Sequence, residues 1–221
     1  MDIYEIGAKL ALFFVPLLFA LCFHEYAHGL VASWLGDDTA ERTGRLTLNP
    51  MAHADMVGTF ILPISAIVFG VPLWIGWAKP VPVNSRNLKH VRKDMFWIAF
   101  AGPLSNLFLA LVISLVMIVG IRFHIFGDYE NSVFPIAKNF LLINVSLAIF
   151  NLLPLHPLDG GKVLARFLPA SLNYKLEQNE QITGFILLGL MLTGVLMYII
   201  GPPIQLVYQG FVSLINAGVF L

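Results

Sequence analysis

The sequence His24-Glu25-Tyr26-Ala27-His28 brings together three side chains that could do chemistry. Two histidines four residues apart lie on one face of a helix, about one turn apart. This spacing allows both imidazoles to bind one zinc ion, with the intervening glutamate as a general base. The same spacing also suits a structural histidine–glutamate pair, and this short pattern by itself does not distinguish the two interpretations.

The residues around this pair predict a membrane helix from about Ile6 to Leu35. A membrane span needs roughly 20 apolar residues, and this stretch is long enough. Two histidines and a carboxylate in such a segment are costly unless they pair, line a wet cavity or bind a metal. The setting therefore favours the metal site over the structural pair.

The composition indicates an integral membrane protein. Of the 221 residues, 58% are hydrophobic and 12% are charged, whereas ordinary soluble domains carry about 25% charged residues. The formal net charge is zero, so no general basic surface is available for nucleic acid. The single cysteine, Cys22, excludes an internal disulfide and a cysteine-based zinc site. We expect the lipid bilayer as a partner and no nucleic acid.

Uncharged stretches predict the other membrane segments. They cover residues 56–78, which are broken by prolines and Gly70, and then 95–121, 139–157 and 181–221. We expect Gly201-Pro202-Pro203 to divide the last stretch into one span and a shorter final segment. Residues 162–180 are polar enough to lie at the interface. Between the first predicted helix and residues 56–78, the Thr43-Gly44-Arg45 sequence followed by alternating leucines predicts a short hairpin.

Together these segments predict an all-α polytopic membrane protein. It has about five to six membrane segments, one of them re-entrant, and a short β-hairpin near the active site. We expect one domain over residues 1–221, with a core over 6–161 and C-terminal membrane segments over 181–221.

Residues 56–78 are predicted to be re-entrant, because only that topology brings the polar groups to one depth. If this segment crosses fully, the first span and the 139–157 span run antiparallel, and His24 and Asp159 lie at different depths. If it enters and leaves on one side, the two spans run parallel and both groups reach one depth. Irregular backbone is tolerated at that depth where protein or water covers it.

The basic residues orient the chain weakly in the same sense. If residues 56–78 are re-entrant, Lys9, Arg122 and Lys138 lie on one side and the other ten of the 13 lysine and arginine residues on the opposite side. A full crossing would give nine against four, so charge discriminates weakly between the two topologies. The positive-inside rule makes the second side cytoplasmic.

Asp159 is the candidate for a third metal ligand. A catalytic zinc usually takes three protein ligands and keeps one position for water. Among the carboxylates in apolar surroundings, Asp159 is the one that ends a predicted membrane span. Gly160 and Gly161 would let the chain turn there. An aspartate in a polar turn at the end of a helix is the alternative.

These motifs in this order resemble the site-2 protease family of intramembrane zinc metalloproteases, in its bacterial and archaeal branch without PDZ or CBS domains. The resemblance rests on His24-Glu25-Tyr26-Ala27-His28, on Ala101-Gly102-Pro103-Leu104-Ser105-Asn106, and on Asn151-Leu152-Leu153-Pro154 followed by Leu158-Asp159-Gly160. Residues 76–84 are also similar to that branch. The motifs extend from residue 24 to residue 161.

The resemblance implies a three-helix catalytic core that cleaves membrane-spanning protein substrates, as in regulated intramembrane proteolysis. It implies one Zn²⁺ per chain held by His24, His28 and Asp159, with Glu25 as the catalytic base. It also implies that Asn151 contacts substrate or stabilises the oxyanion. The expected location is a prokaryotic inner membrane, crossed several times, with the active site facing the cytosol.

Two polar residues near these motifs are open to two interpretations. His156 stands where the family pattern would have proline, and it could act near the metal or simply line the cavity. Asn106 could support the site or make an interhelical hydrogen bond, which is common in membrane helices.

Two other functions remain possible from the residues alone. One is a non-catalytic membrane scaffold that kept the fold, although Glu25 and Asp159 are both present. The other is a metal or proton transporter that uses the same polar residues as a pathway. A transporter typically shows inverted repeats with paired broken helices, and the broken segments here differ in length and context.

Overall fold

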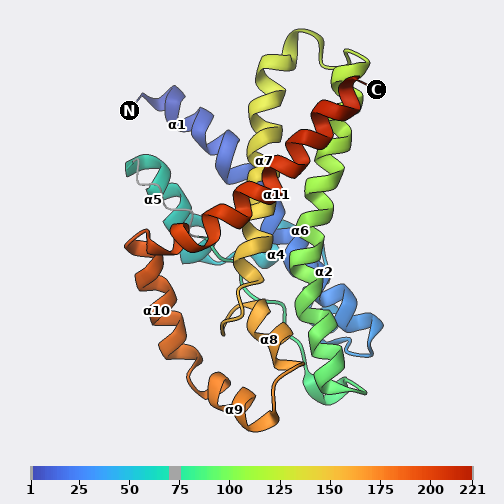
Figure 1. The fold of residues 1–221 in the computed structure, drawn as a ribbon, viewed down its shortest axis with the longest axis vertical. Coiled ribbons are helices and arrows are strands. Elements are labelled where there is room, and N and C mark those ends of the chain that lie inside the picture. Colours follow the sequence, from blue (N-terminus) through green and yellow to red (C-terminus); the bar gives the residue numbers. More distant parts are fainter. Residues whose placement is uncertain (1, 70–75, 221) are drawn as a thin grey trace.

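A computed structural model describes residues 2–69 and 76–220, and it contains helices and no strand within those ranges (Figure 1). The helices are α1 (Ile3–Lys9), α2 (Val15–Trp34), α3 (Thr39–Arg42), α4 (Pro50–His53), α5 (Leu62–Phe69), α6 (Val91–Arg122), α7 (Glu130–Asn151), α8 (Asp159–Ala165), α9 (Ala170–Gln178), α10 (Glu180–Leu192) and α11 (Val195–Phe220). Single π-helical turns at Leu10–Phe14 and Met56–Ile61 join α1 to α2 and lead into α5. The all-helical part of the prediction is confirmed.

Four helical stretches in the described chain are long and apolar enough to cross a membrane. They are Tyr4–Trp34, Val91–Arg122, Gly127–Asn151 and Val195–Phe220, and two shorter apolar helices cover Met56–Phe69 and Glu180–Leu192. The third stretch begins and ends earlier than the predicted 139–157, because Pro135 is accommodated inside α7 and the chain leaves the helix after Asn151. The number of full crossings stays a prediction.

Helices α2, α6 and α7 pack against one another and form the centre of the molecule. In Figure 1, α2 and α7 run in the same general direction, and α6 runs in the opposite direction. The late turns of α2, the early turns of α6 and the end of α7 therefore lie at one end of the three-helix group. This is the parallel arrangement that the depth argument requires.

The segment predicted to be re-entrant returns to its starting point. The backbone N–H of Trp77 donates to the carbonyl of Gly58 at 3.2 Å, and the Thr59 hydroxyl donates to the Trp77 carbonyl at 2.8 Å. Asp55 begins the segment by accepting from the N–H groups of Val57 and Gly58. The predicted break at Gly70 and Pro72 lies outside the described residues.

The predicted β-hairpin is wrong. Thr39–Arg42 forms the short helix α3, and the residues after it make turns and bends. Gly44 has a φ of +67°, and the N–H of Arg45 donates back to the carbonyl of Ala40 at 2.8 Å. This glycine ends a helix in the left-handed conformation, whereas the prediction placed it at the tip of a hairpin.

Asp37 fixes the connection after α2. Its carboxylate is fully buried and accepts from the N–H groups of Thr39 and Asn84 and from the side-chain amide of Asn87. Burial raises the pKa of Asp37, but these hydrogen bonds outweigh burial and hold the pKa below its ordinary value. The carboxylate thus joins the end of α2 to the segment that leads into α6.

The division of the C-terminal stretch is also different from the prediction. The break falls at Gly194, which has a φ of +74°, and α11 continues through Pro202 and Pro203. Leu196, Ile200 and Ile204 repeat every four residues and are buried in one apolar cluster with side chains of α6, α7 and α10. Burial along this face holds the helix together across the prolines, whose missing N–H groups cost hydrogen bonds.

Candidate metal centre

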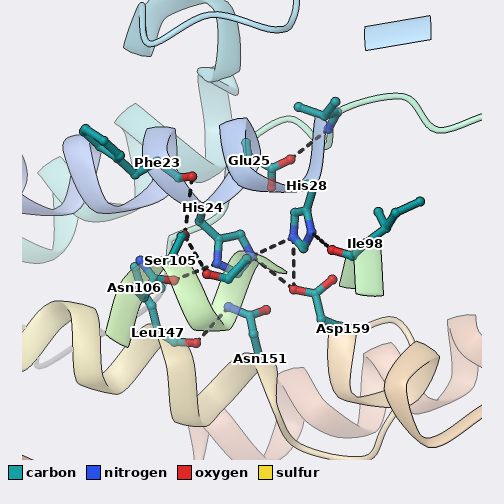
Figure 2. Close-up of polar contacts among 12 residues, drawn as sticks. Phe23, His24, Glu25, His28, Ile98, Ser105, Asn106, Leu147, Asn151 and Asp159 are labelled. Carbon is teal, nitrogen blue, oxygen red and sulfur yellow. Dashed lines mark hydrogen bonds and ion pairs between the residues drawn. The ribbon is translucent and has the colours of Figure 1, made fainter. Parts of the chain in front are cut away.

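Three side chains from two distant parts of the chain converge at the centre (Figure 2). His24 and His28 lie one turn apart on α2, and Asp159 is the first residue of α8. The Asp159 Oδ2 lies 3.0 Å from His24 Nε2 and 3.2 Å from His28 Nε2, and the two Nε2 atoms are 3.1 Å apart. The structure therefore brings together the three residues that the sequence suggested as ligands.

The other nitrogen of each histidine ring faces a hydrogen-bond acceptor on α6. His28 Nδ1 lies 2.6 Å from the carbonyl oxygen of Ile98, and His24 Nδ1 lies 2.7 Å from Oδ1 of Asn106. A carbonyl oxygen only accepts, so each Nδ1 carries the proton and donates it. Each Nε2 then has a lone pair directed at the centre, which is the arrangement of metal-binding histidines.

Two ring nitrogens with lone pairs and a carboxylate oxygen repel one another unless a positive charge lies between them. A single shared proton bridges only two such atoms, whereas three potential metal-ligand atoms lie within 4.8 Å of one another here. Within the described ranges this is the group of histidine and acidic side chains that could hold a metal. Two histidines and a carboxylate are a known ligand set for catalytic zinc, so the residues fit that ion.

The face of α6 that meets the histidines is built from residues four apart. Ile98, Gly102 and Asn106 form one stripe on this helix. A Cβ atom at Gly102 would lie 2.5 Å from His28 Cε1 and 2.6 Å from His24 Cε1. Glycine at this position therefore lets both rings approach the acceptors on either side of it.

Asp159 reaches the centre because the chain turns back after α7. Residues 152–158 leave the helix, and α8 packs against them and against α6. A Cβ atom at Gly160 would overlap the carbonyl oxygens of Leu152 and Leu153. Both Gly160 and Gly161 are helical, so close approach is the reason for glycine at Gly160, and the turn predicted at this pair is not formed there.

Asp159 is 9% exposed. An aspartate binds a metal as the carboxylate anion.

Glu25 does not join the three converging residues. It projects from another side of α2, where its Oε2 accepts from the backbone N–H of Val81 at 2.8 Å (Figure 2). Val81 belongs to the non-helical segment of residues 76–84. This hydrogen bond holds the carboxylate on the segment that runs beside α2.

The remaining predicted residues lie near the centre in different ways. Asn151 is the last residue of α7 and projects toward the centre, with its amide donating to the Leu147 carbonyl at 3.0 Å (Figure 2). His156 is buried, and its Nε2 has no hydrogen-bond partner, but it is not part of the converging group. Asn106 contacts His24 directly. Its side chain therefore both supports the centre and makes an interhelical hydrogen bond between α2 and α6.

Comparison with known proteins decides the family. The family model for peptidase family M50 matches residues 127–196. The chain is 32% identical over 205 residues to "Putative zinc metalloprotease YwhC" of Bacillus subtilis, an alignment that covers 92% of this chain and 90% of that protein. The chain belongs to peptidase family M50, the site-2 protease family. A second relative is "Putative zinc metalloprotease Rip2" of Mycolicibacterium smegmatis, with 31% identity over 79% of this chain and 64% of that protein. No solved structure matches the chain.

The sequence interpretation of this M50 chain missed several groups around the centre. The carbonyl of Ile98 and the N–H of Val81 belong to the backbone, and no side-chain type reveals them. Asn144 is different, because it is a fully buried amide in an apolar membrane segment and it bonds to Asn106. The rule that drew attention to Asn106, that polar residues in membrane helices need partners, would also have found it.

Proposed function

We propose that this M50 chain is an intramembrane zinc metalloprotease that hydrolyses peptide bonds in or near the membrane-spanning segments of substrate proteins. The observation that carries the proposal is the convergence of His24, His28 and Asp159, with both Nδ1 atoms engaged by acceptors. The names of the relatives, which describe zinc metalloproteases, support the same activity.

His24, His28 and Asp159 would hold one zinc ion through their Nε2 and Oδ atoms. When bound, zinc supplies Lewis acidity toward a substrate carbonyl and lowers the pKa of water toward about 7. The Ile98 carbonyl and the Asn106 amide keep the two rings in the tautomer that such binding requires. The apolar helices around the centre exclude bulk water, which strengthens each of these electrostatic interactions.

Glu25 is proposed as the general base and later the general acid. It would accept a proton from the attacking water and return it to the leaving amine. One carboxylate oxygen of Glu25 accepts a hydrogen bond from the Val81 N–H, and a carboxylate can accept several more hydrogen bonds. Asn151 is proposed to contact substrate or to stabilise the oxyanion, since it projects toward the centre from the end of α7.

The proposed setting is a prokaryotic cell membrane with the centre open to the cytosol. The return of Trp77 to Gly58 supports a re-entrant segment. With that topology, the side that holds ten of the 13 basic residues is cytosolic. A substrate must present extended backbone there, because a helix hides its peptide groups.

The variant Glu25→Gln tests the mechanism. It should keep its metal and its fold but lose cleavage of a membrane-spanning peptide by about 10²–10⁴-fold, the usual cost of removing a general base. Glu5→Gln is the matched control, because Glu5 pairs with Lys9 in α1 and lies outside the centre.

Three results distinguish the candidate functions. Cleavage by Glu25→Gln at the wild-type rate would refute Glu25 as base. A wild type that holds zinc but cleaves nothing would favour the scaffold. Movement of metal across vesicles without peptide cleavage would favour the transporter.

A further inference from the structure

A chain of buried amides connects three helices to one metal ligand. Nδ1 of His24 on α2 donates to Oδ1 of Asn106 on α6 at 2.7 Å, and the Asn106 amide nitrogen donates to Oδ1 of Asn144 on α7 at 3.0 Å. The Asn144 amide nitrogen donates in turn to the backbone carbonyl of Phe140 at 2.8 Å. Asn106 and Asn144 are both 0% exposed, so no bulk water can replace a missing partner.

Every hydrogen bond in this chain points the same way, and backbone groups fix the direction. The carbonyl of Phe140 only accepts, so the amide nitrogen of Asn144 must face it and the amide oxygen must face Asn106. Asn106 then presents its nitrogen to that oxygen and to the carbonyl of Ala20, which is 3.1 Å away. Its own oxygen is left for His24.

The direction of the chain determines which nitrogen of His24 carries the proton. If the Asn106 amide were reversed, its nitrogen would face Nδ1, and the proton of a neutral His24 would move to Nε2. A protonated Nε2 cannot bind a metal. A reversed amide would also set the Asn106 oxygen against the carbonyl oxygen of Ala20, which is unfavourable in a buried site.

We propose that Asn144 is a positioning residue for the metal centre, acting through the orientation of the Asn106 amide and so through the tautomer of His24. This inference rests on the proposed zinc site. It assigns a role to a residue of α7 whose side chain hydrogen-bonds to Asn106 and to the Phe140 carbonyl. It also accounts for a hydrogen bond between two fully buried amides of α6 and α7.

The test is the zinc affinity of the purified chain, measured by competition with a chelator. Asn144→Leu removes the acceptor at similar volume, and zinc affinity should fall about 10-fold, at the lower end of the effect of partners of ligating histidines. Asn106→Ala should cost about 10–100-fold. The double variant should bind no more weakly than Asn106→Ala, because Asn144 acts through Asn106.

Two further variants separate positioning from packing. Asn144→Asp stays protonated in an apolar interior, accepts from Asn106 and donates to the Phe140 carbonyl, so it should bind zinc much better than Asn144→Leu. Ser114→Ala is the matched control, because Ser114 is also 0% exposed and donates to the Ala110 carbonyl within α6. It should leave zinc affinity unchanged.

Wild-type zinc affinity in folded Asn144→Leu would overturn the inference, and so would independent, multiplying losses in the double variant. If the leucine variant does not fold, Asn144→Ala takes its place in the same comparison, and an aspartate variant as weak as alanine would again refute the relay. The proposed function fails separately. A wild type that binds no zinc refutes the metal centre. If the wild type binds zinc and the Asn144 variants bind it with the same affinity, only the role of Asn144 is refuted.

Discussion

Replacing Gly102 by alanine should damage the metal centre although it adds only one methyl group. The new Cβ would lie 2.5 Å from His28 Cε1 and 2.6 Å from His24 Cε1, and closer still to His28 Nε2. Favourable contact between carbon atoms begins at about 3.5 Å, so both rings would have to retreat from α6 by about 1 Å.

The retreat would break the hydrogen bonds that orient both rings. Ile98 and Asn106 lie on the same stripe of α6 as Gly102, so a ring that leaves Gly102 also leaves its acceptor. The present distances of 2.6 and 2.7 Å would lengthen to about 3.6 Å, which is beyond hydrogen-bonding range. Each lost partner of a ligating histidine typically costs 10–100-fold, so zinc affinity should fall by at least about 10²-fold.

Helix propensity does not explain this loss, because alanine is a better helix former than glycine by about 1 kcal/mol in a helix interior. Gly120→Ala is the matched control. It lies on the same helix, and its Cβ would overlap the ring of Phe126, far along α6 from the histidines. We expect Gly120→Ala to lower the unfolding temperature but to keep zinc in a chelator titration. Wild-type zinc affinity and cleavage in Gly102→Ala would refute the reasoning from the close approach.

Three more predictions follow from the same structure. Asp159→Ala should lose zinc while His156→Pro keeps it, by metal analysis of the purified variants, and the reverse result would make the histidine the third ligand. Asp37→Asn should cost about 1–3 kcal/mol at pH 7, because one carboxylate oxygen becomes an NH2 group that faces a buried donor. The lowered pKa means that this contribution is complete above the ordinary aspartate value of about 3.9 and is lost as pH falls through the lower folded value, so thermal unfolding of the two proteins should converge in acid. Cysteines placed at Thr43 and Ser85, in a chain without its native cysteine, should react with an impermeant reagent from the same cytosolic side, and labelling from opposite sides would show a full crossing.

Local sequence was sufficient where the relevant interaction is local or compositional. The spacing of His24 and His28 places both rings on one face of any helix, and the long uncharged stretches specify apolar helices. By contrast, Gly44 and Gly194 both take positive φ, and a sequence that contains several glycines does not say which one ends a helix and which one forms a hairpin tip.

What the sequence by itself determined is the set of chemical groups and the kind of helix that carries each one: two histidines and a glutamate on one apolar helix, an aspartate after another, and membership of a family with those motifs. Only the tertiary structure decided how these groups meet. It placed Asp159 Oδ2 at 3.0 Å from His24 Nε2 across 135 residues of chain, turned Glu25 toward Val81, and supplied Ile98, Asn106 and Asn144 as supports. The physical reason is that a hydrogen bond or a metal ligand needs a partner within about 3 Å. Such distances depend on the packing of α2, α6, α7 and α8 against one another, which no local pattern of residues encodes.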